Sequence, residues 1–94
     1  MALETSLYDS ADYLDSPEAI AAYIEAAFED GEPAVITHAL GIVARAKGMS
    51  KLARDAGVTR EALYKALTAD GDPKLSTFVG VMKALGLRLT AQAA

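Results

Sequence analysis

A chain of 94 residues, 52% of them hydrophobic, can form one small core but not two. It has no cysteine and one histidine, which excludes disulfides, thiolate sites and multi-histidine zinc sites. Its longest uncharged stretch, residues 34–44, falls short of the roughly 20 residues that span a bilayer, and its first residues lack the basic start of a secretory signal, so we expect a soluble, cytoplasmic protein.

The formal net charge of −4 is unevenly divided along the chain. Residues 1–33 carry nine carboxylates and no lysine or arginine, which gives them a charge of −9. Residues 34–94 carry all nine basic side chains and four carboxylates, which gives them a charge of +5. Parts of opposite sign suggest partners of opposite charge, although a solvated acidic leader beside a mildly basic domain would look the same.

Residues 1–15 show no helical periodicity and predict an extended acidic leader. The first helix is predicted to begin at Pro17, with Ser16 as its N-cap, and to end before Gly31. Its apolar face consists of residues at helical spacing: Ile20, Tyr23, Ile24, Ala27 and Phe28.

A second helix is predicted to begin at Pro33, to run to about Lys47 and to end at Gly48. So much of its circumference is apolar that we expect other helices to surround it: Val35, Ile36, Ala39, Leu40, Ile42, Val43 and Ala46. A narrow polar strip is left for His38, Gly41 and Arg45.

Three shorter helices are predicted to follow, over residues 49–56, over residues 60–67, and between the turn-rich loop 69–73 and Gly86. The last of them has an apolar face made of Leu75, Phe78, Val79, Met82 and Leu85. Residues 87–90 alternate like a short strand, and its exposed edge is a candidate surface for pairing with a second copy.

Residues 50–67, SKLARDAGVTREALYKAL, have the pattern of a helix-turn-helix. The first helix of that motif must present a small residue where the two helices meet, and the turn needs a residue that tolerates positive φ. Ala53 and Gly57 meet these demands, and anchors to the core are expected at Leu52, Val58, Leu63 and Ala66 or Leu67. An ordinary helical hairpin could carry the same alanine and glycine.

The side chains expected to face outward from this motif suit DNA. Thr59 is a good N-cap, and the remaining outward residues are Arg60, Glu61, Tyr64, Lys65 and Thr68. Because a recognition helix reads base edges near its N-terminus, we place Arg60 and Tyr64 at bases, with Thr59, Lys65 and Lys51 at phosphates. Glu61 either accepts from cytosine N4 or turns back onto Arg60 or Lys65, and both interpretations remain open.

Two segments carry a wider resemblance, YDSADYLDSPEAIAAYIEAAFEDGEP and ARAKGMSKLARDAGVTREALYKALTADGDPKLSTFVGVMKALGLRL. From about Glu4 to Thr90 the chain resembles the antidote (antitoxin) proteins of bacterial addiction modules, prophage-type lambda-repressor-like regulators encoded beside RelE/ParE-like toxins. The resemblance implies a DNA-binding antidote that neutralises a small basic toxin and represses its own operon, usually as a homodimer. It places Thr59, Arg60, Glu61, Tyr64 and Lys65 on the DNA-facing helix, whereas Met49 stands where many such motifs begin with glutamine.

The resemblance also suggests a role for the acidic leader. Carboxylates that face a basic toxin would speed its capture and protect its phosphate-binding surface from RNA. The predicted toxin-binding residues combine apolar anchors with acids: Leu7, Tyr8, Tyr13 and Leu14 with Asp9, Asp12 and Asp15. The alternative is that the apolar side chains fold back onto the core of their own domain.

Other chemistry finds little support in the sequence. The three aspartates of DSADYLD lack the alternating spacing, the glycine and the closing glutamate of a calcium loop, so we expect no metal. His38 has no triad-like partner and there is no phosphate-binding glycine loop, so we expect neither an enzyme nor a cofactor.

The prediction is therefore an all-α chain, with a leader over residues 1–15 and a five-helix lambda-repressor-like domain over residues 16–94 that contains the motif 49–67 and ends in a short strand. Its predicted function is that of an antitoxin that binds a basic RelE/ParE-like toxin and operator DNA. The alternative is a helical interaction adaptor, or an antidote without DNA binding.

Overall fold

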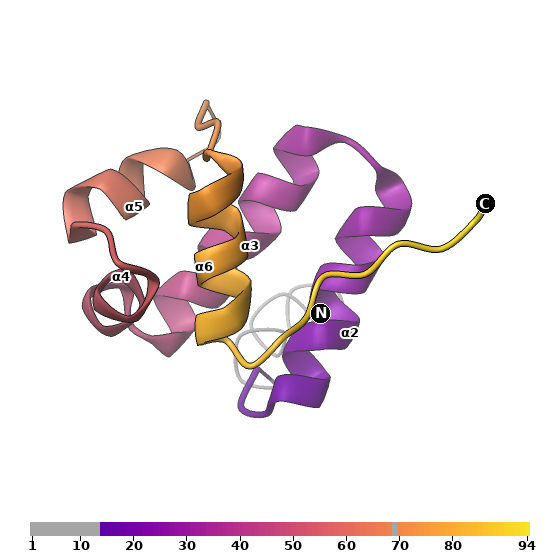
Figure 1. The fold of residues 1–94 in the computed structure, drawn as a ribbon, viewed down its shortest axis with the longest axis horizontal. Coiled ribbons are helices and arrows are strands. Elements are labelled where there is room, and N and C mark those ends of the chain that lie inside the picture. The colour runs from indigo at the N-terminus through magenta and orange to yellow at the C-terminus, as the bar shows by residue number, and fades with distance from the viewer. Residues whose placement is uncertain (1–13, 69) are drawn as a thin grey trace, which may run out of the picture.

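The computed structural model describes residues 14–68 and 70–94 of the chain. These residues contain five helices, labelled as in Figure 1: α2 (Pro17–Asp30), α3 (Pro33–Lys47), α4 (Met49–Ala56), α5 (Arg60–Ala66) and α6 (Leu75–Ala84). The described part of the chain contains no strand, so the predicted all-α class is confirmed for it. The predicted bounds of α2 to α5 are confirmed to within one residue.

The ends of α2 and α3 follow from local chemistry. The side-chain oxygen of Ser16 accepts a hydrogen bond from the backbone N–H of Ala19 at 3.2 Å, which caps the free N–H groups at the start of α2. Gly31 ends the same helix in the left-handed conformation, with φ of 83°. α3 then begins at Pro33, where the missing N–H of proline costs no hydrogen bond.

All five helices contribute to one hydrophobic core. Figure 1 shows α6 in front of α3 near the middle of the molecule, with α4 and α5 on one side and α2 on the other. Phe28 of α2 and Phe78 of α6 contact each other edge to face, with ring centroids 6.2 Å apart. The largest fully buried side chains are Ile20, Ile24, Leu40, Val43, Leu63 and Val81.

The burial of α3 differs from the prediction. Val35 and Ala46, expected to be covered, are exposed, whereas Thr37 and Gly41 are buried. The reason is that the neighbouring helices cover only part of its circumference and leave turns at both ends uncovered. The predicted polar strip is thus wrong at Gly41, although His38 and Arg45 are exposed as expected.

The buried stripe of α6 is also rotated relative to the prediction. Leu75 is 74% exposed and Val79 is exposed as well, whereas Val81, which was not predicted to face the core, is completely buried. Phe78, Met82 and Leu85 belong to both the predicted and the observed stripe. The positions of the neighbouring helices, rather than the apolar pattern of α6 alone, select which of its apolar residues are covered.

The predicted strand over residues 87–90 is wrong. Gly86 takes φ of 79° and the N–H of Leu87 donates to the carbonyl of Met82 at 2.8 Å, which closes the end of α6. The chain then runs without regular structure alongside α2 to residue 94 (Figure 1). Alternating residues cannot form a strand unless a second strand pairs with them, and the described residues offer none.

The predicted leader lies mostly outside the described residues, which begin at Leu14. Leu14 is only 4% exposed and belongs to the core, whereas Asp15 is exposed. The leader boundary at residue 15 stays a prediction. None of the described helices combines the length and the apolar composition that crossing a bilayer requires.

Candidate nucleic-acid interface

The segment predicted as a DNA-binding motif forms two short helices, α4 and α5, joined by a tight turn. Gly57 occupies the left-handed region with φ of 79°, and the N–H of Val58 donates to the carbonyl of Ala53 at 3.0 Å. Ala53 is almost completely buried. The prediction of a small residue on the first helix and a positive-φ glycine in the turn is therefore confirmed.

The start of α5 is fixed by its predicted cap. Thr59 has extended backbone angles, and its hydroxyl oxygen accepts a hydrogen bond from the N–H of Ala62 at 3.0 Å. Thr59 is exposed, so its hydroxyl proton remains available to an acceptor outside the protein. This hydrogen bond fixes where α5 begins, and the residues of its first turn are exposed.

Buried side chains and two glycines hold α5 against the rest of the domain. Leu63 and Leu67 are buried, as predicted. A Cβ on Gly41 of α3 would lie 2.7 Å from the carbonyl oxygen of Leu67, and one on Gly71 would clash with the carbonyl oxygen of Ala66. Neither glycine was among the predicted site residues. Only the presence of a glycine inside a long helix, which costs helix stability, could have indicated the role of Gly41.

The opposite face of α5 presents an exposed group of side chains: Arg60, Glu61, Tyr64 and Lys65. Tyr64 is 52% exposed, a large uncovered area for an aromatic ring. Guanidinium, phenol and ammonium groups on one short helix can donate hydrogen bonds to base edges and phosphates. The structure therefore brings together the four predicted residues that lie on α5.

Besides the N-cap Thr59, two predicted residues lie outside α5, and they differ in how available they are to DNA. Lys51 on α4 has a 70% exposed side chain and forms an ion pair with Asp55 at 3.0 Å, a contact that a phosphate can replace. Thr68 is half-buried, and its hydroxyl donates to the carbonyl of Lys65 at 2.9 Å. Because that proton is already used, Thr68 offers less to a phosphate than Thr59 does.

The position of Glu61 bears on one of the two open interpretations. Within residues 14–68 and 70–94 no ion pair joins Glu61 to Arg60 or to Lys65. All three side chains are exposed and belong to the same helix. In this structure Arg60 is thus not held by Glu61, and its guanidinium can contact another molecule.

The acidic helix α2 and the helix proposed to bind DNA, α5, are separated in space. α5 lies at one end of the molecule and α2 at the other (Figure 1). α2 carries exposed Glu18, Glu25 and Glu29 and no basic residue, whereas α5 carries Arg60 and Lys65. The carboxylates of α2 therefore stand far from the exposed face of α5, and Debye screening further weakens their repulsion of a polyanion there.

Two of the predicted toxin-binding residues, Leu14 and Asp15, fall within the described part of the chain. Leu7, Tyr8, Asp9, Asp12 and Tyr13 lie outside the described residues. Leu14 packs in the core, which is the alternative that the sequence left open for it, while Asp15 is exposed. Among the described residues no group of three or more histidine or acidic side chains is placed to hold a metal ion.

Comparison with known proteins gives two matches. A family model described as "Probable addiction module antidote protein" matches residues 4–93 of the chain. An uncharacterized protein of Haemophilus influenzae is 45% identical over 85 residues, which cover 90% of this chain and 88% of that relative. No solved structure matches significantly.

Proposed function

The chain belongs to the family of probable addiction module antidote proteins, and from that premise we propose that it neutralises a toxin by direct binding and represses its own operon by binding operator DNA. The antidote role rests on membership of this family. The repressor role, in which α4 and α5 form a lambda-repressor-like helix-turn-helix, rests on the surface of α5. The protein acts in the cytoplasm and is not an enzyme.

One observation carries the DNA-binding proposal: α5 presents Arg60, Tyr64 and Lys65 to solvent while its other face is held by Leu63 and Leu67. A rigidly held helix with exposed donors can enter the major groove of DNA without reorganising. Arg60 reaches guanine O6 and N7, Tyr64 contacts a neighbouring base, and Lys65 holds a phosphate. If two copies bind as a twofold dimer, their α5 helices sit one DNA turn apart, roughly 34 Å.

The charge of the first third of the chain supports a basic toxin of the RelE/ParE type as the partner. Residues 1–33 carry nine carboxylates and no basic side chain, which opposes DNA binding and favours a cationic protein. The exposed acids of α2 lie away from α5, which supports separate binding surfaces for the toxin and for DNA.

The test is binding of the purified chain to the DNA upstream of its own gene across a series of salt concentrations. A specific complex gives a steep loss of affinity with salt and a large preference over unrelated DNA of equal length. Binding that is weak and indifferent to sequence would contradict the repressor role. A chain that then still neutralises its toxin would be an antidote without DNA binding.

A further inference from the structure

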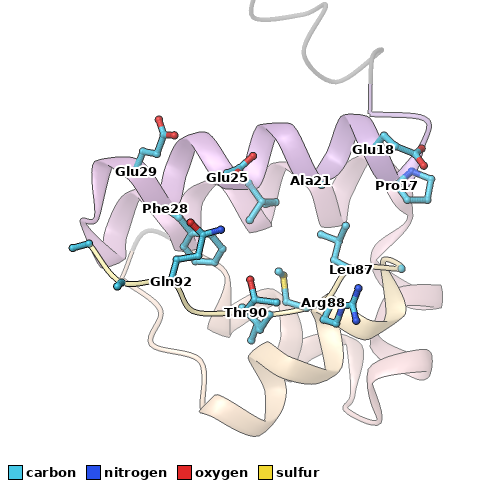
Figure 2. A pocket seen from close by; sticks show the side chains of 16 residues that line it. Pro17, Glu18, Ala21, Glu25, Phe28, Glu29, Leu87, Arg88, Thr90 and Gln92 are labelled. Atoms are coloured by element: carbon cyan, nitrogen blue, oxygen red, sulfur yellow. The ribbon is translucent and has the colours of Figure 1, made fainter.

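A groove runs between α2 and the C-terminal segment, residues 86–94, with a volume of about 1010 Å³ (Figure 2). The floor is apolar and contains Ile24, Phe28, Met82 and Leu87. Phe28 is 37% exposed despite its contact with Phe78, so part of its ring is uncovered. Gly86 and Pro17 both line the groove and lie close together, since a Cβ on Gly86 would be 3.7 Å from the proline ring.

The two walls of the groove differ in charge. The α2 wall carries Glu18, Glu25 and Glu29, which are exposed and separated by seven and four residues, so they share one side of the helix. The other wall, which includes Thr90 and Gln92, has a single charged side chain, Arg88 (Figure 2). The groove thus combines an apolar floor with an acidic edge along α2.

We propose that this groove is where the chain captures its toxin, by binding a segment that bears lysine or arginine beside apolar side chains. This inference rests on the proposed antidote function and assigns it a surface. Glu18 and Glu29 are about 17 Å apart along the helix axis, enough for about three turns of a partner helix. Basic side chains of that segment face the glutamates of α2, and its apolar side chains cover Phe28 and Leu87.

The charge of the groove favours a basic segment over the other molecules that could bind there, namely DNA, a second copy of the chain and residues 1–13 of the chain itself. DNA is repelled by the three glutamates. A second copy joined through a twofold axis along α2 would place the same glutamates opposite one another. Residues 1–13 of the chain itself carry Glu4, Asp9 and Asp12 and no basic side chain, so they do not complement this edge either.

The assignment also explains how one small domain serves two partners. The groove is built on α2, and α5 lies at the other end of the molecule (Figure 1). A toxin in the groove therefore leaves α5 free for operator DNA. The cationic toxin then also adds positive charge to the complex on DNA.

The decisive experiment measures capture of the small basic protein encoded beside this chain's gene. The test variant is Glu25→Arg with Glu29→Arg. The matched control is Asp30→Arg with Glu32→Arg, which makes the same change of charge at two exposed positions outside the groove. We expect roughly tenfold weaker capture for the test variant, with a smaller salt dependence, and little change for the control.

A second variant tests the other wall. Removing residues 89–94 deletes the wall beyond Arg88 and leaves the buried core complete. We expect it to weaken toxin capture without weakening operator binding. Reversing a basic residue of the toxin to glutamate restores its capture by the Glu25→Arg, Glu29→Arg chain if the two surfaces meet directly. Thermal unfolding and operator binding of every variant verify that the fold is intact.

The outcomes separate the groove from the antidote function. If the unaltered chain captures the toxin and both groove variants capture it equally well, the groove assignment is wrong and the antidote function stands. If the unaltered chain captures no toxin, the proposed function fails and the assignment fails with it. If the charge reversal alters self-association but not toxin capture, the groove is an interface between copies and the assignment is again overturned.

Discussion

Gly41 and Leu67 are in backbone contact: a Cβ on Gly41 would lie 2.7 Å from the carbonyl oxygen of Leu67. α3 therefore reaches the end of α5 with no room for even one methyl group. Since α5 carries the exposed side chains proposed to read DNA, this contact ties the central helix to the orientation of that face. Close backbone approach of this kind requires glycine.

The first prediction concerns Gly41→Ala. In an open helix this change would stabilise by up to about 1 kcal/mol, because alanine has the higher helix propensity. Overpacking a closed contact costs about 1–3 kcal/mol, so after that gain we expect a net loss of up to about 2 kcal/mol in the free energy of unfolding. Urea denaturation measures this loss, and operator affinity should fall with it because α5 is displaced.

Gly80→Ala is the control for Gly41→Ala, because it makes the same substitution at a less crowded helical glycine. A Cβ on Gly80 would meet the carbonyl oxygen of Ala56 at 3.1 Å, a contact that a small shift relieves. We therefore expect Gly80→Ala to cost less stability than Gly41→Ala and to leave operator affinity nearly unchanged. A Gly41→Ala chain as stable as the Gly80→Ala chain would show that α3 does not fix α5.

Local signals predicted the helix ends and the turn, because each depends on a few neighbouring residues. Ser16, Gly31 and Thr59 act on hydrogen bonds within their own helix end, so the sequence contains the whole interaction. The same holds for Gly57, whose positive φ is required within a single turn.

The predictions that failed were ones that required knowledge of distant neighbours. Val79 and Val81 are equally apolar, and only the placement of other helices buries the second and not the first. The strand expected near Leu87 needed a partner strand that the described residues do not supply. The spacing of apolar residues in α3 assigned Gly41 to the polar strip. The close approach of α5 to Gly41 could not be predicted, because it does not alter the apolar pattern of α3. The groove beside α2 likewise arises where two segments far apart in sequence meet.

The second prediction separates base reading from phosphate binding. Arg60→Ala should cost about 1–3 kcal/mol on the preferred operator and relax the preference at one position. Lys65→Ala should weaken every DNA similarly and reduce the salt slope by about one. Binding titrations on the operator and on unrelated DNA across a salt series measure both effects.

Arg88→Ala is the charge-matched control, since Arg88 is an exposed arginine on the wall of the groove beside α2 (Figure 2). It should leave the preference for the operator unchanged. Small and equal losses for Arg60→Ala and Lys65→Ala on every DNA would mean that α5 does not read sequence.

The third prediction concerns Glu61→Gln. Because Glu61 forms no ion pair with Arg60 or Lys65 in the described structure, we expect its carboxylate to face DNA and accept from cytosine N4. Glutamine favours adenine instead, so the variant should shift the preference at one base pair by about 1 kcal/mol. Operators changed one base pair at a time measure the shift, and Glu32→Gln, on the α2–α3 connection, is the neutral comparison. A uniform gain in affinity on all DNA, with no change of preference, would mean that Glu61 only repels the phosphates and does not contact a base.

The last prediction concerns the acidic leader, and the burial of Leu14 decides where to cut. Leu14 is 4% exposed in the core, so the cut is made after residue 13, because removing Leu14 as well would destabilise the fold. The cut deletes Glu4, Asp9 and Asp12, three negative charges that attract a basic toxin and repel DNA. We expect capture of the toxin to slow at least about fivefold at low salt, with operator affinity equal or higher.

Replacing the three acids by amides in the full chain separates their charge from the contacts of Leu7, Tyr8 and Tyr13, because it should slow association without speeding dissociation. Full neutralisation of the toxin by the shortened chain, at an unchanged rate, would show that the leader takes no part and would leave the groove beside α2 as the capture surface.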